Sequence, residues 1–365
     1  MKKICHMTSA HSSKDIRIFY KECTTLAKAN YQVVLLCQGS DYQENGVQIK
    51  GTGKYYSSRI KRMLFAGRDV YRKALEENAD LYHFHDPELL PYGLKLKKKG
   101  KRVIYDSHED VPRQILAKTW IPIGIRNFVS KVFEKYEKRV AKKLDGVVCA
   151  TNYIQDIFIN TGCKNVVDVK NYPLLDDIEC LVDNYESREN IICYAGGVTE
   201  QRGITTLVDS IENLDINLQI AGDISSEYRE ELQKHIGWEK VSCLGFLDRK
   251  GISTLYNRSR IGMVVLKDTP NHRHALPIKM FEYMAAGLPV IASDFSAWKS
   301  IIEEEKCGLC VNPNNCKEVE NAIAYLIENE KSAKVMGENG RKAVCAKYSW
   351  NREAKKLVEF YQEVV

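Results

Sequence analysis

The residues best suited to chemistry are concentrated between His272 and Asp294, where the sequence reads HRHALPIKMFEYMAAGLPVIASD. Pro277 fits the start of a helix, since its missing N–H would have no partner there, and Gly287 fits the left-handed turn that ends one. Because unpaired N–H groups at a helix start attract phosphate, we expect a phosphate site at Ile278, Lys279 and Met280. Glu282, one turn further in, could accept hydrogen bonds from both hydroxyl groups of a ribose.

A glycine-rich loop upstream has the same chemical character. An expected strand, Ile191–Ala195, leads into Gly196, Gly197, Arg202 and Gly203 before an expected helix over residues 205–214. Glycines let the backbone approach a phosphate closely, and an arginine meets it with a forked donor. The segment from His272 to Asp294 is expected to be held in the same way, by a helix over 279–286 and an apolar strand over 290–292. Strand and helix signals alternate in this way along the whole chain, which is typical of parallel α/β layers.

The first half of the chain carries its candidates at the ends of expected strands. Strands over 81–85 and 103–106 both enter histidine-bearing loops, and His108 is the strongest candidate among them. Asp106 and two further acids lie close enough in sequence to fix the tautomer of its imidazole. A loop histidine satisfied by these neighbours is the alternative, and for His85 and Asp86 a structural role is favoured. The loop between the expected first strand and helix contains Ser12, Ser13 and Asp15.

The segment around Glu282 resembles the donor-sugar motif of the family 4 retaining glycosyltransferases, which have the GT-B fold. That motif has a Glu, seven residues and a second Glu, followed by a helix and a strand. The residues that fit are Glu282, Met284, Ala285, Gly287, Pro289, Val290, Ile291, Ala292 and Ser293. Two positions depart from the pattern: His274 replaces the first Glu, and Gly197 stands where an arginine is usual. Arg202 stands for the usual lysine of the glycine loop.

The resemblance implies two doubly wound domains facing a cleft, with a C-terminal helix that crosses back to the first domain. It implies a retaining transferase that moves a sugar from a nucleoside diphosphate, most simply a UDP-sugar, without a metal or other cofactor. His108 and His274 would flank the sugar, and Gly222 and Phe246 would line the nucleotide. Ser12, Ser13 and Asp15 would lie near the acceptor, a glycan, small molecule or lipid-linked glycan of cell-surface polysaccharide synthesis. Positive residues at 272–274 could replace the charge missing at Gly197.

Three alternatives stay open. Glu282 could pair with Lys279 inside an ordinary buried helix. The chain could be a nucleotide-sugar epimerase of the same architecture, in which the two histidines serve as acid and base; an epimer released from the donor alone would indicate this. It could also be a non-catalytic subunit that binds sugar or a partner protein, for which neither donor binding nor turnover is expected.

Length and composition bound the rest. The 365 residues suffice for two domains, expected over 1–170 and 191–345 with a linker over 171–190 and a returning helix over 346–365. The net charge is +6, with basic clusters at 59–73, 95–102 and 131–143. Such clusters suit an anionic lipid surface or substrate, or a solvated face; nucleic acid is not expected as a partner. Residues 119–143 fit either an interfacial helix or, as favoured here, a helix packed on its domain.

Targeting and redox signals are few. The start, MKKICHMTSA, lacks the sustained apolar core of a signal peptide and is expected to form the first strand. A cytoplasmic protein is expected, with contact to the inner face of the membrane left open. The twelve cysteines are expected to be reduced thiols, mostly buried. Cys307 and Cys310 form a CxxC pair, but no second pair at suitable spacing supports a zinc site there.

Overall fold

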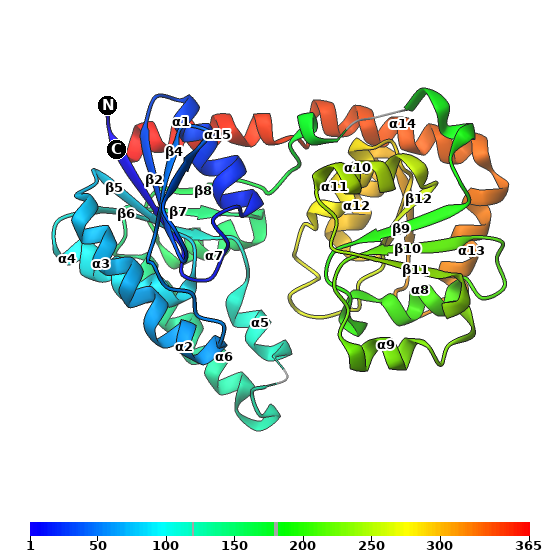
Figure 1. The fold of residues 1–365 in the computed structure, drawn as a ribbon, viewed down its shortest axis with the longest axis horizontal. Coiled ribbons are helices and arrows are strands. Elements are labelled where there is room, and N and C mark those ends of the chain that lie inside the picture. Colours follow the sequence, from blue (N-terminus) through cyan, green and yellow to red (C-terminus); the bar gives the residue numbers. More distant parts are fainter. Residues whose placement is uncertain (119, 179–181) are drawn as a thin grey trace. The chain divides into compact units, whose positions relative to one another are not determined.

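The computed structural model describes residues 1–118, 120–178 and 182–365, and it divides into two compact units (Figure 1). The first unit consists of Met1–Asn171 together with Asn351–Val365, and the second of Tyr172–Trp350. Each unit has its own sheet and its own core, and each is described by itself below.

The first unit contains an eight-stranded sheet in the order β3-β4-β2-β1-β5-β6-β7-β8. All neighbouring strands are parallel except the β3–β4 hairpin. The strands are β1 (Lys3–Met7), β2 (Gln32–Cys37), β3 (Tyr42–Glu44), β4 (Val47–Gly51), β5 (Leu81–Phe84), β6 (Arg102–Ser107), β7 (Gly146–Cys149) and β8 (Val166–Asp168). The order reverses between β1 and β5, and such a switch point is where doubly wound sheets bind ligands.

Helices flank this sheet (Figure 1). They are η1 (Ile16–Cys23), α1 (Thr24–Lys28), α2 (Arg59–Lys61), η2 (Arg62–Ala66), α3 (Gly67–Glu77), η3 (Pro87–Leu89), α4 (Leu90–Lys98), α5 (Val111–Ala117), α6 (Ile123–Ala141), α7 (Asn152–Thr161) and α15 (Trp350–Val364). The helix expected after the loop of Ser12, Ser13 and Asp15 is a π-helical stretch, η1, continued by α1. Thr119, the first residue of the expected 119–143 segment, lies outside the described residues.

The last helix, α15, is part of the first unit although it ends the chain. The buried hydroxyl of Tyr361 lies 2.7 Å from His83 Nδ1, and the Arg102 guanidinium donates to the carbonyl of Val364 at 3.0 Å. The Lys170 N–H donates to the Glu353 carboxylate at 2.8 Å. The returning helix therefore joins the core of the first unit through buried polar contacts as well as apolar packing.

The second unit contains a six-stranded parallel sheet in the order β11-β10-β9-β12-β13-β14. The strands are β9 (Ile191–Ala195), β10 (Asn217–Ala221), β11 (Val241–Gly245), β12 (Ile261–Val264), β13 (Val290–Ser293) and β14 (Gly308–Val311). This is the 3-2-1-4-5-6 order of a dinucleotide-binding fold, with its switch point between β9 and β12. Buried strands of this kind read as continuous apolar runs, as the sequence showed.

The helices of the second unit are η4 (Leu175–Asp177), η5 (Val182–Ser187), η6 (Glu200–Arg202), α8 (Ile204–Ser210), α9 (Ser226–Leu232), η7 (Ile236–Lys240), α10 (Arg249–Arg258), α11 (Ile278–Ala285), α12 (Ser296–Glu305), α13 (Cys316–Glu328) and α14 (Glu330–Ala346). Helix α8 ends at Ser210, four residues before the expected end at residue 214, and residues 211–213 form a turn. None of the described helices of either unit is long and apolar enough to cross a membrane.

The linker was expected over 171–190, but only Asn171 is counted with the first unit, and the chain from Tyr172 on is counted with the second. The ring of Tyr172 packs against that of Phe281 at 4.7 Å between centroids. The Arg188 guanidinium donates to the carbonyls of Tyr256, Ser259 and Ala286 at 2.8–2.9 Å. Residues 179–181 of the expected linker lie outside the described residues.

Candidate functional site

The glycine loop after β9 is shaped by close backbone contacts. Gly196 has φ +130°, and a Cβ added at Gly222, which has φ +152°, would lie 2.0 Å from the Gly196 carbonyl oxygen. A Cβ added at Gly203, with φ +75°, would lie 1.7 Å from the carbonyl oxygen of Val265. These glycines are therefore needed to bring the loops after β9, β10 and β12 together.

Lys279 reaches this loop from the first turn of α11. Its side chain is buried, its Nζ lies 3.7 Å from the ring centroid of Tyr194, and a Cβ added at Gly196 would stand 2.8 Å from that Nζ. Burial, and next the charge of Arg202, hold the Lys279 pKa well below its ordinary value. Within the described chain, no carboxylate lies within ion-pairing distance of this ammonium group.

Arg202 and His272 lie close to Lys279. Arg202, at the end of η6, is half-buried, and among the described residues it has no carboxylate partner. The buried ring of His272 has its Nδ1 2.9 Å from the Lys267 carbonyl oxygen, and burial lowers its pKa. Two cations without a carboxylate beside a glycine loop form a site that an anion would neutralise.

Helix α11 begins as expected, directly after Pro277, and no side chain caps its first turn. The Ile278 side chain is half-buried, whereas Met280 is buried in the core, so its contribution to a phosphate site is limited to its backbone. Trp298 Nε1–H donates to the carbonyl of Ala275 at 2.6 Å and fixes the loop that leads to the helix.

Glu282 is half-buried on α11, and its Oε2 accepts a hydrogen bond from the Tyr256 hydroxyl at 3.0 Å. No ion pair joins it to Lys279 in the described structure, so the alternative of a simple intrahelical pair is not what the fold forms. Tyr256 instead orients the carboxylate from the neighbouring helix α10.

The positive residues at 272–274, in the loop before α11, were expected to replace the charge missing at Gly197, but Arg273 is paired elsewhere. Arg273 is exposed, and its Nε and NH2 groups are paired with the two Asp268 oxygens at 2.5 and 2.7 Å. Its charge is therefore already matched, and the cations that face the glycine loop are Lys279 and Arg202. His274 is exposed. Gly197 is exposed as well, and its carbonyl accepts from the Tyr194 hydroxyl at 2.8 Å.

Phe246, expected to line the nucleotide, directly follows β11 and is 82% exposed. Gly222 closes the adjacent loop, with its N–H donating to the Gly245 carbonyl at 2.8 Å. Both lie on the loops that follow neighbouring strands, which is the edge where ligands of doubly wound sheets bind.

The candidates of the first unit lie on its own sheet edge. His108 is partly exposed, and its Nδ1 lies 3.2 Å from Asp106 Oδ2, so Asp106 can fix the tautomer as expected. Ser12 is exposed and Ser13 half-buried. The Asp15 carboxylate caps η1 by accepting from the Ile18 N–H at 2.9 Å, a structural role that competes with contact to an acceptor. His108 and His274 belong to different units.

The buried contacts of Asp86 in the first unit were not predicted from the sequence. Asp86 is fully buried and accepts from Thr8 and from the Ser9 N–H, and it is ion-paired with His11 at 2.8 Å. The Asp86 pairing, acting against burial, raises the pKa of His11 to about 9. These contacts, and that of the buried His85 Nδ1 with Asp106 Oδ2 at 2.8 Å, agree with the structural role favoured above.

Four further buried residues, Arg17, Glu22, His6 and His83, were also missed. The His83-x-His85 alternation could have pointed to His83, because side chains two apart share a face of a strand. The other three residues lie on different elements, and that alternation gives no signal for them.

The fold and the site together are those of a nucleotide-binding protein with two doubly wound units. One unit carries a glycine loop with nearby cations and a glutamate on a helix. Comparison with known proteins agrees. The protein-family model described as "Glycosyltransferase Family 4" matches residues 17–169 of the sequence, and the one described as "Glycosyl transferases group 1" matches residues 182–343. The chain belongs to the family 4 glycosyltransferases, and its fold is GT-B, so both expectations are confirmed.

Individual relatives are distant. An uncharacterized glycosyltransferase of Methanocaldococcus jannaschii is 24% identical over 60% of each chain, so the match spans less than two thirds of that relative. Sucrose-phosphate synthase from Thermosynechococcus elongatus has a TM-score of 0.82 at 17% identity, covering 100% of this chain and 99% of its own. Anabaena HepE in complex with UDP-glucose has a TM-score of 0.77 at 13% identity, covering 100% of both chains. These structural likenesses are likenesses of fold.

Proposed function

We propose that this chain transfers a sugar from a nucleoside-diphosphate donor to an acceptor, with retention of the anomeric configuration. The observation that carries the proposal is the set of two cations without carboxylate partners, Lys279 and Arg202, beside the glycine loop after β9. One helical turn away, Tyr256 orients the carboxylate of Glu282. A nucleoside diphosphate is complementary to this arrangement: its phosphates would meet the two cations, and its ribose hydroxyl groups would donate to the carboxylate.

The chemical demand of the reaction is to stabilise the diphosphate as it leaves. Lys279 and Arg202, with the N–H groups that open α11, would supply positive charge where negative charge develops. Because the lysine is already desolvated and held against the Tyr194 ring, little reorganisation is needed during the reaction. The chain's own cations can thus fill the role that a metal ion serves elsewhere, so we propose that transfer requires none.

By the family resemblance, His108 and His274 are the residues that we propose contact the sugar. In the family pattern the position of His274 is an acid, so its imidazole would offer a neutral or positive group to the sugar. We propose that His108 orients a sugar or acceptor hydroxyl, with its tautomer fixed by Asp106 at 3.2 Å.

A panel of nucleotide sugars, screened by thermal shift, tests the donor proposal. UDP-sugars come first, because a fold neighbour was solved with UDP-glucose. A true donor should raise the melting temperature by mass action. Glu282→Gln should weaken its binding by about 10- to 100-fold, the cost of a hydrogen bond to a charged group.

The matched control is Glu303→Gln, an exposed acid on α12, which should leave donor binding unchanged. A donor that stabilises wild type and Glu282→Gln equally would contradict the proposed ribose contact. An epimer released from donor without acceptor would favour the epimerase instead, and no donor binding at all would favour the non-catalytic subunit. The anomeric configuration of the product, read by NMR, tests retention.

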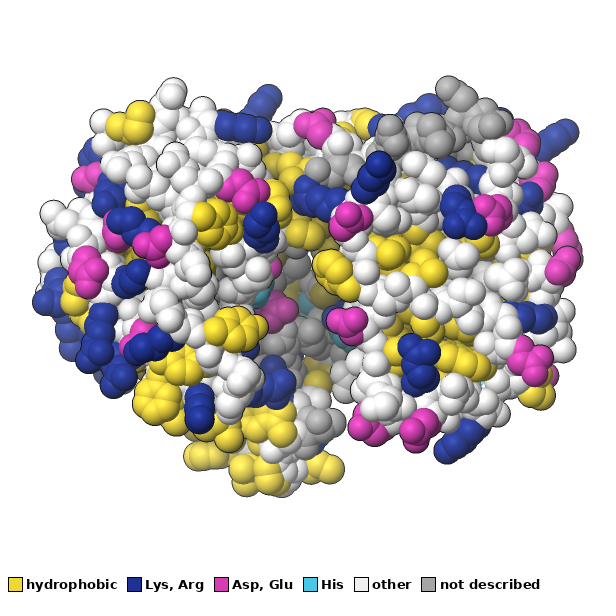
Figure 2. All heavy atoms as spheres, in the orientation of Figure 1, with side chains coloured by type: hydrophobic (Ala, Val, Ile, Leu, Met, Phe, Trp, Pro, Cys, Tyr) yellow, Lys and Arg dark blue, Asp and Glu magenta, His cyan; other side chains and the backbone are white. Residues whose placement is uncertain are grey.

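The acceptor class is suggested by an apolar surface on the first unit. Figure 2 shows hydrophobic side chains gathered at the end of this unit, over α2 and α6, with Lys and Arg beside them. The exposed members are Ile60, Met63, Leu64, Phe65, Trp120, Ile123, Ile125, Phe128, Val132 and Tyr136. The Arg59 guanidinium stands 5.8 Å from the Trp120 ring centroid, so the two segments adjoin.

We propose that this surface, residues 59–68 and 120–136, rests on an anionic membrane and that the acceptor is lipid-linked. Large exposed apolar patches mark interaction sites, and the exposed cations Lys61, Arg68, Lys131 and Lys135 suit anionic headgroups. The expectation of a helix packed on its domain holds for one face of α6 only, since Phe128 is 70% exposed.

Co-sedimentation with vesicles tests this surface. Binding is expected to vesicles of phosphatidylglycerol and phosphatidylcholine, to weaken with salt, and to be lost in Phe128→Ser. The control is Ile236→Ser, an equally exposed apolar residue of the second unit, which should bind as wild type does. Equal binding by both variants would refute the assignment of the surface.

A further inference from the structure

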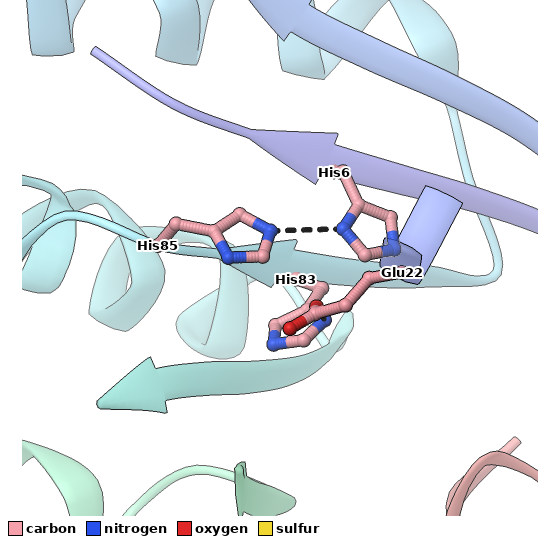
Figure 3. A group of neighbouring side chains, drawn as sticks. All are labelled: His6, Glu22, His83 and His85. Carbon is pink, nitrogen blue, oxygen red and sulfur yellow. Dashed lines mark hydrogen bonds and ion pairs between the residues drawn. The ribbon is translucent and has the colours of Figure 1, made fainter. Parts of the chain in front are cut away.

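A group of polar side chains is enclosed in the first unit, at the switch point of its sheet. His6 comes from β1, Glu22 from η1 and His83 from β5, and His85 directly follows β5 (Figure 3). His6 and His83 are register partners on adjacent strands, and all four side chains are essentially inaccessible to solvent. None of them is used in the proposed sugar transfer.

Each imidazole has one nitrogen engaged by an outer partner. His85 Nδ1 lies 2.8 Å from Asp106 Oδ2, and His83 Nδ1 lies 2.7 Å from the Tyr361 hydroxyl. His6 Nε2 lies 3.2 Å from the same hydroxyl. Outer contacts of this kind fix the tautomer and orientation of metal-binding histidines.

The second nitrogens of His6 and His85 remain within the group. His6 Nδ1 and His85 Nε2 face each other at 2.9 Å, as Figure 3 shows. His83 Nε2 is buried and has no hydrogen-bond partner among the described residues. The four residues can each place one ligand atom so that all four atoms lie within 4.8 Å of one another.

The Glu22 carboxylate is the second unusual feature. It is fully buried with its Oε2 3.7 Å from His83 Nδ1, and within the described structure neither oxygen accepts a hydrogen bond. Arg17 Nε is 3.1 Å from Glu22 Oε1, yet the Arg17 guanidinium donates its hydrogen bonds to Asp106 and to the Val169 carbonyl. One arginine thus stands between two buried carboxylates. A buried carboxylate without a hydrogen-bond donor is costly unless it is neutralised or binds a cation.

We propose that His6, Glu22, His83 and His85 bind one transition-metal dication, with Zn²⁺ as the best match. Three imidazole nitrogens and one carboxylate oxygen are ligands that Zn²⁺ accepts in a tetrahedral site. Metal–ligand bonds of about 2.1 Å place tetrahedral ligand atoms about 3.4 Å apart. The group would contract from its present spread, while the His6 and His85 nitrogens would separate slightly and give up the proton between them.

The ion would have a structural role. It would join β1, η1 and β5, and through Tyr361 it would orient α15, the segment that comes from the far end of the chain. The donor-binding residues lie in the other unit, and the group touches the proposed sugar-transfer residues only through Asp106, whose Oδ2 lies 2.8 Å from His85 Nδ1 and 3.2 Å from His108 Nδ1. None of the four ligands contacts the donor, so failure of the metal proposal would leave the proposed function standing.

The direct test measures metal in the untagged, full-length protein. After incubation with ZnSO₄ and exhaustive dialysis, we expect about one Zn²⁺ per chain by mass spectrometry, and a rise in melting temperature that a strong chelator reverses. X-ray absorption of that sample should show nitrogen and oxygen ligands with imidazole scattering. Sulfur ligands would place the ion at the cysteines and overturn the proposal, as would a zinc content far below one per chain.

Variants give the matched comparison. Glu22→Gln and His83→Asn should each lower the affinity for Zn²⁺ at least about tenfold. His235→Asn, which removes a partly exposed histidine of the second unit, should retain the ion. Retention in all three variants would overturn the assignment. Because the wild-type absorption spectrum is independent of the variants, a variant that fails to fold leaves the test intact.

Discussion

Binding of a nucleotide sugar should be coupled to proton uptake by Lys279. In the free protein its ammonium group is buried beside Arg202 with no carboxylate in ion-pairing range among the described residues, so its pKa lies well below its ordinary value. A bound diphosphate would place negative charge beside Nζ and raise that pKa again. The lysine would therefore be protonated in the complex over a pH range in which it is neutral in the free protein.

The sign and the size of the effect follow from this difference. Below the lowered pKa of the free protein, Lys279 is charged in both states and donor affinity is independent of pH. Above it, each pH unit weakens binding by up to tenfold, about 1.4 kcal/mol, until the pKa of the complex is reached. The loss with rising pH is the expected direction for a cation whose pKa increases on binding.

Isothermal titration calorimetry can measure this proton uptake. The UDP-sugar found in the thermal panel is titrated in buffers of different ionisation heats, since its diphosphate has no group that titrates near neutrality. The apparent enthalpy should vary with the buffer in wild type and not in Lys279→Met, while Lys299→Met, an exposed lysine of α12, should behave as wild type does. The reasoning is refuted if wild type takes up no proton at any pH from about 6 to 10, or if Lys279→Met takes up as many.

Three further outcomes are expected. Burial raises the pKa of Glu137 to about 7 from 4.5, so wild type should lose about 3 kcal/mol of stability as the pH rises from about 4.5 through 7; chemical denaturation should show that loss abolished in Glu137→Gln. Arg273→Ala should change donor affinity less than about twofold, because that guanidinium is held by Asp268, and a large loss by calorimetry would restore its proposed contact with the diphosphate. Gly203→Ala should lower the melting temperature markedly, since its Cβ would lie 1.7 Å from the Val265 carbonyl oxygen; an unchanged value would show that the loop can open.

The sequence predicted local elements well because each depends on neighbouring residues. The apolar run of β9 was placed at its observed bounds, and Pro277 and Gly287 fixed α11 to within one residue. Its motif also led to the family, since a contiguous segment around Glu282 carries its own pattern of helix start, acid, glycine and strand. These features are decided within one turn or one strand.

Only the tertiary structure decided which charges meet. Arg273 forms an ion pair with Asp268, whereas Lys279 packs against the Tyr194 ring and Gly196. These contacts arise because the loops after β9 and β12 approach within contact distance. The buried group of three histidines and Glu22 is brought together from β1, η1 and β5, and the partner of two of the histidines, Tyr361, comes from the last helix. Parallel sheets place residues far apart in the chain on adjacent strands, so sequence spacing has no information about such contacts.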